Sequence, residues 1–199
     1  MEEADELVPQ PDSKGFLSIT NRAWVTLDPA IWRMTTQIIT LDLSYNSIFE
    51  LPPQIGELQI LRELRCSINK ISIIPPQIGR LQRLRRLYLN GNRIKKLPDE
   101  IGKLQLLEEF TLSENSLEDL PKTIANIAGM LRQCSLPTTF SLDFFPVYPL
   151  LPLTLALRVL KLQNNKLHSL PYEIADLQTL EVLDCSNNPD LAMVYSVYT

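Results

Sequence analysis

Apolar residues recur along the chain in one order that is repeated end to end. In each copy an apolar residue is followed by two variable residues and then by two apolar residues separated by one variable position, as in the run LRRLYLN from Leu84. This alternation is typical of a short strand with one buried face. Further apolar residues follow at helical spacing, as in Leu97, Ile101 and Leu104. The pattern therefore predicts one short strand and one helical or irregular turn per copy.

An asparagine follows each predicted strand and defines the period of the repeat. Successive asparagines are 23, 23, 23, 50 and 23 residues apart. Because an amide both donates and accepts hydrogen bonds, we expect these side chains to form a buried structural ladder with backbone groups of neighbouring copies. A single copy cannot bury its own apolar face, so stacking must supply the core. The ladder residues are Asn46, Asn69, Asn92, Asn115, Asn165 and Asn188.

The full template is L-x-x-L-x-L-x-x-N-x-L-x-x-L-P-x-x-I-x-x-L, and it resembles the leucine-rich-repeat family. The L-P and I-G elements are similar to the intracellular branch with 23-residue repeats, which includes Ras suppressor protein, Erbin, Scribble and the plant Ras-group proteins. The resemblance covers about residues 38–127 and 157–194. It implies an α/β solenoid, or horseshoe, with one short parallel strand per repeat on the concave face. It also implies an adaptor or scaffold in intracellular signalling that binds a protein partner, such as a small GTPase, on that face.

The template divides the chain into six segments. In the second segment, Trp24 and Trp32 could shield the open end of the core. The last copy ends without a recognisable cap, whereas a solenoid needs a polar terminal repeat over its last apolar layer, so we expect a fragment or a truncated gene product. In order, the segments are a flexible acidic tail (1–14), a degenerate N-terminal cap repeat (15–37), four repeats (38–127), an irregular apolar insertion (128–156), one repeat plus a truncated repeat (157–194) and an uncapped tail (195–199).

The insertion interrupts the template after Ile127. Between Ile127 and Leu157 there are 29 residues where the repeat has two, an excess of 27. One interpretation is a functional loop, because long apolar, proline-rich loops are unusual in compact domains. The other interpretation is a retained intron. Codons for residues 128–130 can contain a splice donor and codons for residues 155–156 a splice acceptor, and removal of the 27 codons between these sites would restore the 23-residue register of the repeat. Sequencing of the transcript distinguishes the two.

Composition and charge narrow the location and the class of partner. The formal net charge of -4 argues against non-specific nucleic-acid binding, which needs a basic surface. The N-terminus lacks the features of a signal peptide, and the three cysteines are not clustered as in disulfide-bonded caps, so we expect a monomer in the cytoplasm. The most apolar stretch, 136–160, is interrupted by four prolines, and its apolar run is shorter than the roughly 20 residues of a membrane span.

The sequence offers little chemistry for catalysis. Its one histidine, His168, follows a strand without a metal-ligand pattern around it, and Cys66 and Cys185 occupy inward strand positions. No phosphate-binding loop, nucleophile elbow or dinucleotide-binding motif is present in the sequence. We therefore expect no enzymatic activity, no cofactor and no metal.

The outward strand positions are the candidate binding residues. Arginine and tyrosine are enriched at interface hot spots, and they gather in the second and third repeats. These positions predict a partner-binding patch that faces an acidic site on the partner, although a solvated polar face would show the same residue types. The candidate residues are Arg65, Arg86, Tyr88, Glu109 and Lys161 at outward strand positions, together with Arg85 on the rim.

Two further functions remain open. The chain could be the recognition region of a larger multidomain enzyme, such as a kinase, a ubiquitin ligase or a GTPase. It could also be a truncated product without independent function. The sequence downstream of Thr199 would discriminate, because an appended catalytic domain supports the first and a stop after one capping repeat opposes it.

Overall fold

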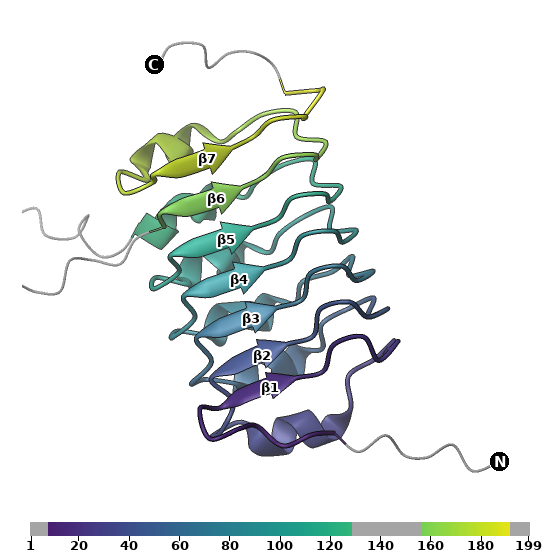
Figure 1. Cartoon of the computed structure of the whole chain (residues 1–199). Coiled ribbons are helices and arrows are strands. Elements are labelled where there is room, and N and C mark those ends of the chain that lie inside the picture. The colour runs from purple at the N-terminus through teal and green to yellow at the C-terminus, as the bar shows by residue number, and fades with distance from the viewer. Residues whose placement is uncertain (1–7, 129–156, 192–199) are drawn as a thin grey trace, which may run out of the picture.

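In the computed structural model, which describes residues 8–128 and 157–191, seven strands form one parallel sheet in sequence order. Figure 1 shows the strands stacked side by side along the molecule. Each strand pairs with the next in the same register, so that Leu41, Leu64 and Leu87 lie next to one another. The predicted leucine-rich-repeat solenoid is therefore confirmed. The strands are β1 (Phe16–Ser18), β2 (Thr40–Asp42), β3 (Glu63–Arg65), β4 (Arg86–Tyr88), β5 (Glu109–Thr111), β6 (Val159–Lys161) and β7 (Val182–Asp184).

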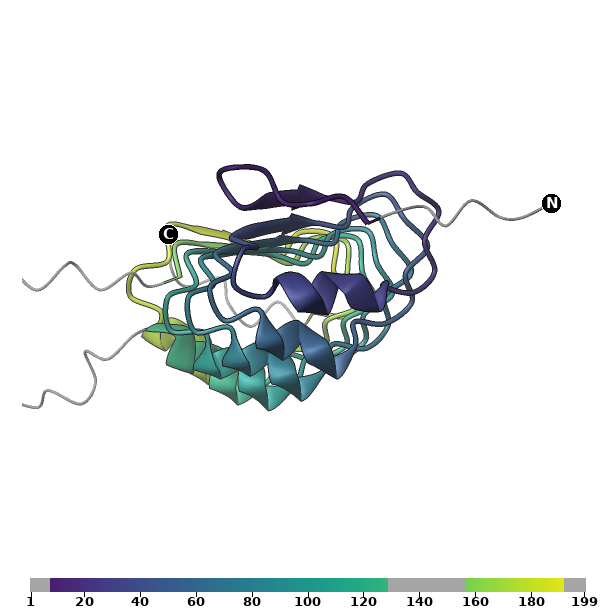
Figure 2. The same cartoon turned by 90° about the horizontal axis from the view of Figure 1, so that it is seen from below.

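Short 3₁₀ helices cover the face of the solenoid opposite the sheet (Figure 2). Several begin at a proline whose extended backbone turns the chain into the helix, as at Pro52 before Pro53. The helices η2, η3, η4 and η8 end after about one turn, where a leucine such as Leu58 leaves the helical conformation. The helices are η1 (Pro29–Met34), η2 (Pro53–Glu57), η3 (Pro76–Arg80), η4 (Asp99–Lys103), η5 (Lys122–Ala128) and η8 (Tyr172–Asp176).

The core is a continuous apolar stripe between the sheet and the helices. The inward strand residues, such as Leu87 and Leu89, are fully buried, as is Ile101 from the helical side. Glycine lets neighbouring helices approach closely: a Cβ atom at Gly102 would lie 2.2 Å from the carbonyl oxygen of Thr123. Each large aliphatic side chain in this stripe contributes about 1.5–3 kcal/mol by its burial. Stacking of repeats therefore supplies the stability that no single repeat has.

The repeat that begins at Leu157 stacks directly on the one that begins at Leu107. Strand β6 pairs with β5 in the same register as the other neighbours, with Phe110 opposite Leu160. Asn165 donates a hydrogen bond of 3.0 Å to the carbonyl of Leu112 across this junction. The predicted insertion, apart from residue 128, lies outside the described residues, as does the predicted tail 195–199.

The N-terminal end of the solenoid is more ordered than the sequence suggested. Val8 is 6% exposed and packs in the core, and the carboxylate of Asp12 accepts hydrogen bonds from the amides of Lys14 and Phe16. Val8 is thus buried in the core and Asp12 shapes the turn into β1, within the segment 1–14 that we predicted to be a flexible acidic tail. Among the residues that the structure describes, no helix has the length and apolar character needed to cross a membrane.

Candidate binding surface on the concave face

An asparagine after each strand from β2 to β7 bonds to the backbone of its own repeat and of the preceding one. The Nδ2 group of Asn92 donates to the carbonyls of Leu89 and Cys66, each at 2.9 Å. Its Oδ1 atom accepts a hydrogen bond of 3.0 Å from the amide of Ile71. These bonds fix the turn at the end of the strand. Corresponding bonds are made by Asn46, Asn69, Asn115, Asn165 and Asn188.

The residue before each of these asparagines has a left-handed backbone, and two repeats place large apolar side chains there. Tyr45 has φ 61° and Ile68 has φ 56°, whereas the next repeat has Gly91 at φ 63°. This conformation costs roughly 1–2 kcal/mol for a residue with a Cβ atom and is rare for a β-branched one. Burial does not compensate the cost, because Tyr45 is 54% and Ile68 49% exposed. Strained, exposed positions of this kind are typical of functional surfaces.

Glu63 organises the middle of the concave face. It stands at an outward position of β3, yet it is 3% exposed because two guanidinium groups cover it. Arg65 Nε donates to its Oε1 atom, and Arg86 Nε donates to its Oε2 atom at 2.7 Å. The hydrogen bond to Glu63 raises the pKa of Arg86. Arg65 also lies 3.9 Å from the carboxylate of Asp42. The two arginines are thus held in place by two flanking carboxylates.

Tyr88 is held by contacts on both sides. Its hydroxyl donates a hydrogen bond of 2.8 Å to Glu109 on the next strand, and the guanidinium carbon of Arg65 lies 5.9 Å from its ring centroid. Burial, together with the hydrogen bond to Glu109, raises the pKa of the Tyr88 hydroxyl. The side chain is therefore neutral and fixed in one orientation before any partner binds.

These side chains surround a hollow of about 330 Å³ at the end of the strands where the chain turns. We call it the concave hollow. Its lining combines two tyrosines, one arginine and one carboxylate, the residue types that form anchors in protein interfaces. The lining residues are Asp42, Ser44, Tyr45, Arg65, Ser67 and Tyr88.

The predicted binding residues fall into three groups. Arg65, Arg86, Tyr88 and Glu109 form one connected network. Arg85 pairs with Glu108 and lies apart from that network. Lys161 lies on β6, opposite Thr111.

The pairing of the arginines changes the expected chemistry of the partner. We expected an acidic site opposite the patch, but Glu63 and Asp42 already neutralise Arg65 and Arg86. A partner carboxylate would have to compete with them.

The sequence interpretation missed Tyr45 and Ile68. The predicted residues lie on the strands or, for Arg85, directly before one, whereas Tyr45 and Ile68 follow the strands. A signal was present, because three of the four equivalent positions in later repeats carry Gly91, Asn164 and Asn187, which tolerate a left-handed backbone, while the fourth carries Glu114.

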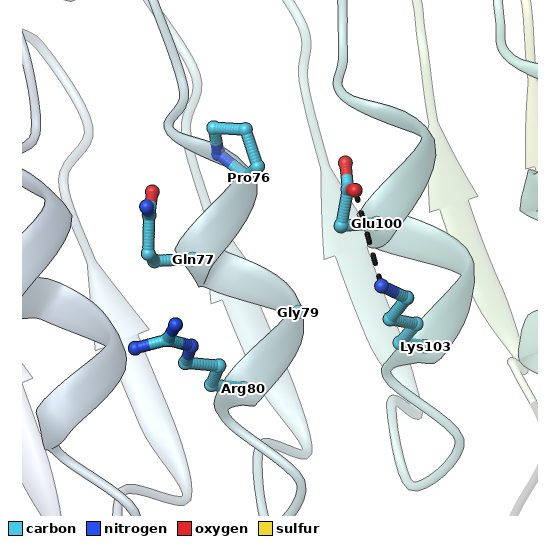
Figure 3. Close-up of a pocket in the computed structure, with 6 residues that line it drawn as sticks. All are labelled: Pro76, Gln77, Gly79, Arg80, Glu100 and Lys103. Atoms are coloured by element: carbon cyan, nitrogen blue, oxygen red, sulfur yellow. Dashed lines mark ion pairs between the residues drawn. The ribbon is translucent and has the colours of Figure 1, made fainter.

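A second hollow, of about 190 Å³, lies on the convex face between η3 and η4 (Figure 3). Its charged side chains do not converge: Lys103 pairs with Glu100 at 3.8 Å, while Gln77 and Arg80 extend away from them. Gly79 accounts for the close packing of the two helices, since a Cβ atom there would lie 2.6 Å from the carbonyl oxygen of Glu100. We therefore regard this hollow as a consequence of helix packing.

The described residues present no assembled metal or nucleophile site. No three histidine, cysteine or acidic side chains in residues 8–128 and 157–191 lie close enough to hold a metal ion. His168 is exposed, and its Nδ1 atom lies 3.2 Å from the carbonyl oxygen of Glu118. Burial raises the pKa of the Cys66 thiol, and that of Cys185 to about 11, which disfavours the nucleophilic thiolate.

Comparisons with known proteins agree with this architecture. A family model described as leucine-rich repeats in two copies matches residues 61–99 and 82–122, and a second, described as a leucine-rich repeat, matches residues 37–58. A leucine-rich-repeat protein of Leptospira interrogans is 28% identical with a TM-score of 0.57, over 89% of this chain and 50% of that one. The crystal structure of PEPR1–AtPEP1 is 25% identical with a TM-score of 0.62, over 81% of this chain and 19% of that one.

A third solved structure, the functional domain of InlJ from Listeria monocytogenes, shows the same fold. It is 18% identical with a TM-score of 0.65, over 89% of this chain and 31% of that one. The chain thus spans half or less of the length of these three structures. No curated protein matches it. Its repeats are leucine-rich repeats, and the chain folds as a leucine-rich-repeat solenoid, an architecture that commonly serves as a protein–protein interaction module.

Proposed function

We propose that this chain is a protein-interaction module that binds a partner in the concave hollow and acts as a cytoplasmic adaptor or scaffold. The observation that carries the proposal is the convergence of Tyr45, Tyr88 and Arg65 around one hollow. Arg65 and Tyr88 are fixed by carboxylates, so a partner would order few side chains on binding. Tyr45 is 54% exposed, so a partner that covers its ring would gain from the burial of that apolar surface.

The hollow favours a partner that inserts an aromatic or other uncharged side chain. The guanidinium group of Arg65 and the rings of Tyr45 and Tyr88 offer flat surfaces for stacking. Asp42 and the serines of the lining can accept or donate hydrogen bonds at its edge. The resemblance of the repeats to the Ras suppressor branch makes a small GTPase the first partner class to test.

Paired alanine variants test the proposal. The amount of partner protein recovered in a pull-down with the unmodified chain is compared with the amount recovered with the double variant Tyr45→Ala, Tyr88→Ala. Removal of two hot-spot tyrosines should cost about 2 kcal/mol or more, so recovery should fall at least about thirtyfold. The control is Tyr172→Ala on η8, because Tyr172 is 72% exposed on the convex side. Equal recovery by the double variant and the control would refute binding in the concave hollow.

A second candidate function is recognition within a larger enzyme. The chain spans half or less of the length of the solved structures that resemble it. In that case the concave hollow would select a substrate for a kinase, ubiquitin-ligase or GTPase domain elsewhere in the protein. Sequencing of the gene beyond the codon for Thr199 tests this, and a stop codon after one capping repeat would exclude it.

A further inference from the structure

A larger hollow, of about 600 Å³, lies on a different surface, along the segments that lead from the strands to the helices in the second and third repeats. These segments lie on the arrowhead side of the sheet in Figure 1. We call it the edge groove. Most of its exposed lining is apolar, and the lining has no residue in common with the concave hollow. Its lining includes Ile73, Arg93, Lys95, Lys96 and Glu118.

Ile73 gives the groove its apolar character. It is 61% exposed, although its backbone is held by a parallel bridge to Glu50 of the preceding repeat. The equivalent positions 23 residues away in each direction carry Glu50 and Lys96, and the repeat after that carries Asp119. The repeat that begins at Leu157 carries Ser169 there, so an isoleucine stands in a row that is otherwise polar or charged, and burial in the fold does not explain it.

Three cations border the groove. Arg93, Lys95 and Lys96 are exposed, and none of them forms an ion pair with another residue in the described part of the chain. Glu118 is the one acidic side chain of the lining. The groove therefore has an excess of positive charge in a chain whose formal net charge is -4.

We propose that the edge groove binds an acidic peptide segment of a partner protein, with one apolar side chain of that segment seated against Ile73. Arg93, Lys95 and Lys96, which have no ion pair within the described ranges, complement acidic residues of the peptide, and the apolar lining accepts its apolar side chain. The negative net charge of the whole chain opposes the approach of membranes and nucleic acids, whose negative charge extends over a large area. A short acidic segment that enters a groove experiences mainly the local positive charge.

Fluorescence anisotropy tests the proposal with a fluorescein-labelled peptide that carries one central leucine between runs of glutamate. Two groove variants are compared with the unmodified chain: Ile73→Asn, and the double variant Lys95→Gln, Lys96→Gln. Each should raise the Kd about tenfold, which is about 1.4 kcal/mol. Because Ile73 is mostly exposed, its replacement leaves the core intact, and the lysine variant tests the site independently.

Matched controls change the same residue types elsewhere. Val182→Asn removes another exposed aliphatic side chain, and Lys14→Gln with Lys166→Gln removes two exposed lysines outside the groove. Both should bind the peptide within about twofold of the unmodified chain, a difference of about 0.4 kcal/mol. The double variant Tyr45→Ala, Tyr88→Ala should also bind normally, which separates this site from the concave hollow.

Four results would overturn the proposal. The first is failure of the unmodified chain to bind the peptide, and the second is equal affinity for a peptide with serine in place of leucine. The third is an equal loss of peptide affinity in the groove variants and the control variants. The fourth is displacement of the peptide by phosphatidylserine vesicles or a single-stranded oligonucleotide at equal charge concentration. The last result would identify a general anion-binding surface.

Discussion

Replacement of Asn92 by alanine tests the physical basis of the stacked repeats. Asn92 is 8% exposed, so water has little access to the groups that its amide satisfies. The substitution removes the donors to the Leu89 and Cys66 carbonyls and the acceptor for the Ile71 amide. Two of these three backbone groups belong to the preceding repeat, so the loss falls on the junction between repeats.

The expected cost follows from the number of buried groups that lose a partner. The Ile71 amide is left without its side-chain acceptor, at a cost of about 1–3 kcal/mol. The carbonyls of Cys66 and Leu89 still accept from Asn69 and Asn115, so each loses one of two hydrogen bonds, at about 1 kcal/mol. Together these losses should lower the free energy of unfolding by about 3 kcal/mol or more. The control is Asn90→Ala in the same repeat. Asn90 accepts one part-buried hydrogen bond, from the amide of Ser113 at 3.0 Å, so its loss should cost about 1 kcal/mol.

Urea unfolding followed by circular dichroism measures the difference. With a slope of about 2 kcal/mol per molar urea, the midpoint should fall by about 1.5 M for Asn92→Ala and by about 0.5 M for Asn90→Ala. The slope itself should not change. Equal shifts for the two variants would refute the argument that buried asparagine bonds hold neighbouring repeats together.

Three further predictions address packing, backbone strain and reactivity. Gly102→Ala should destabilise the chain by about 1–3 kcal/mol, because its Cβ atom would collide with the carbonyl oxygen of Thr123; an unchanged melting temperature would contradict the close approach of η4 and η5. Ile68→Asn should stabilise it by about 1 kcal/mol and raise the melting temperature by about 2–4 °C, because asparagine tolerates the left-handed backbone; a lower melting temperature would show that Ile68 is not strained. Iodoacetamide at about pH 8 should leave Cys66 unmodified in the folded chain, because burial raises the pKa of its thiol; rapid labelling detected by peptide mass spectrometry would contradict this.

The solenoid could be predicted from the sequence because its packing is local and repeated. Every copy buries the same positions, so the core appears directly as a 23-residue pattern of residues such as Leu87, Leu89 and Ile101. The in-register stacking of β5 and β6 shows that this pattern persists across the interruption. The end of the N-terminal tail was harder to predict, because Val8 packs on the core without belonging to the template.

The candidate site depends on contacts that a repeat pattern does not contain. Glu63 is buried only because Arg65 and Arg86, from two different strands, cover it, and either arginine could in principle have pointed elsewhere. The exposure of Tyr45 and Ile68 depends on the backbone conformation of the turn. Residue type alone predicted which strands carry the candidate site, whereas the ion pairs depend on side-chain orientations that the repeat pattern does not determine.

The most direct test of concave-face binding is hydroxyl-radical footprinting of two tyrosines, with and without a purified partner recovered by the intact chain. Tyr45 borders the concave hollow and is 54% exposed, whereas Tyr172 lies on η8 of the convex side and is 72% exposed. Binding in the concave hollow predicts that the partner slows oxidation of Tyr45 and leaves that of Tyr172 unchanged. Protection of Tyr172 with no change at Tyr45 would contradict it.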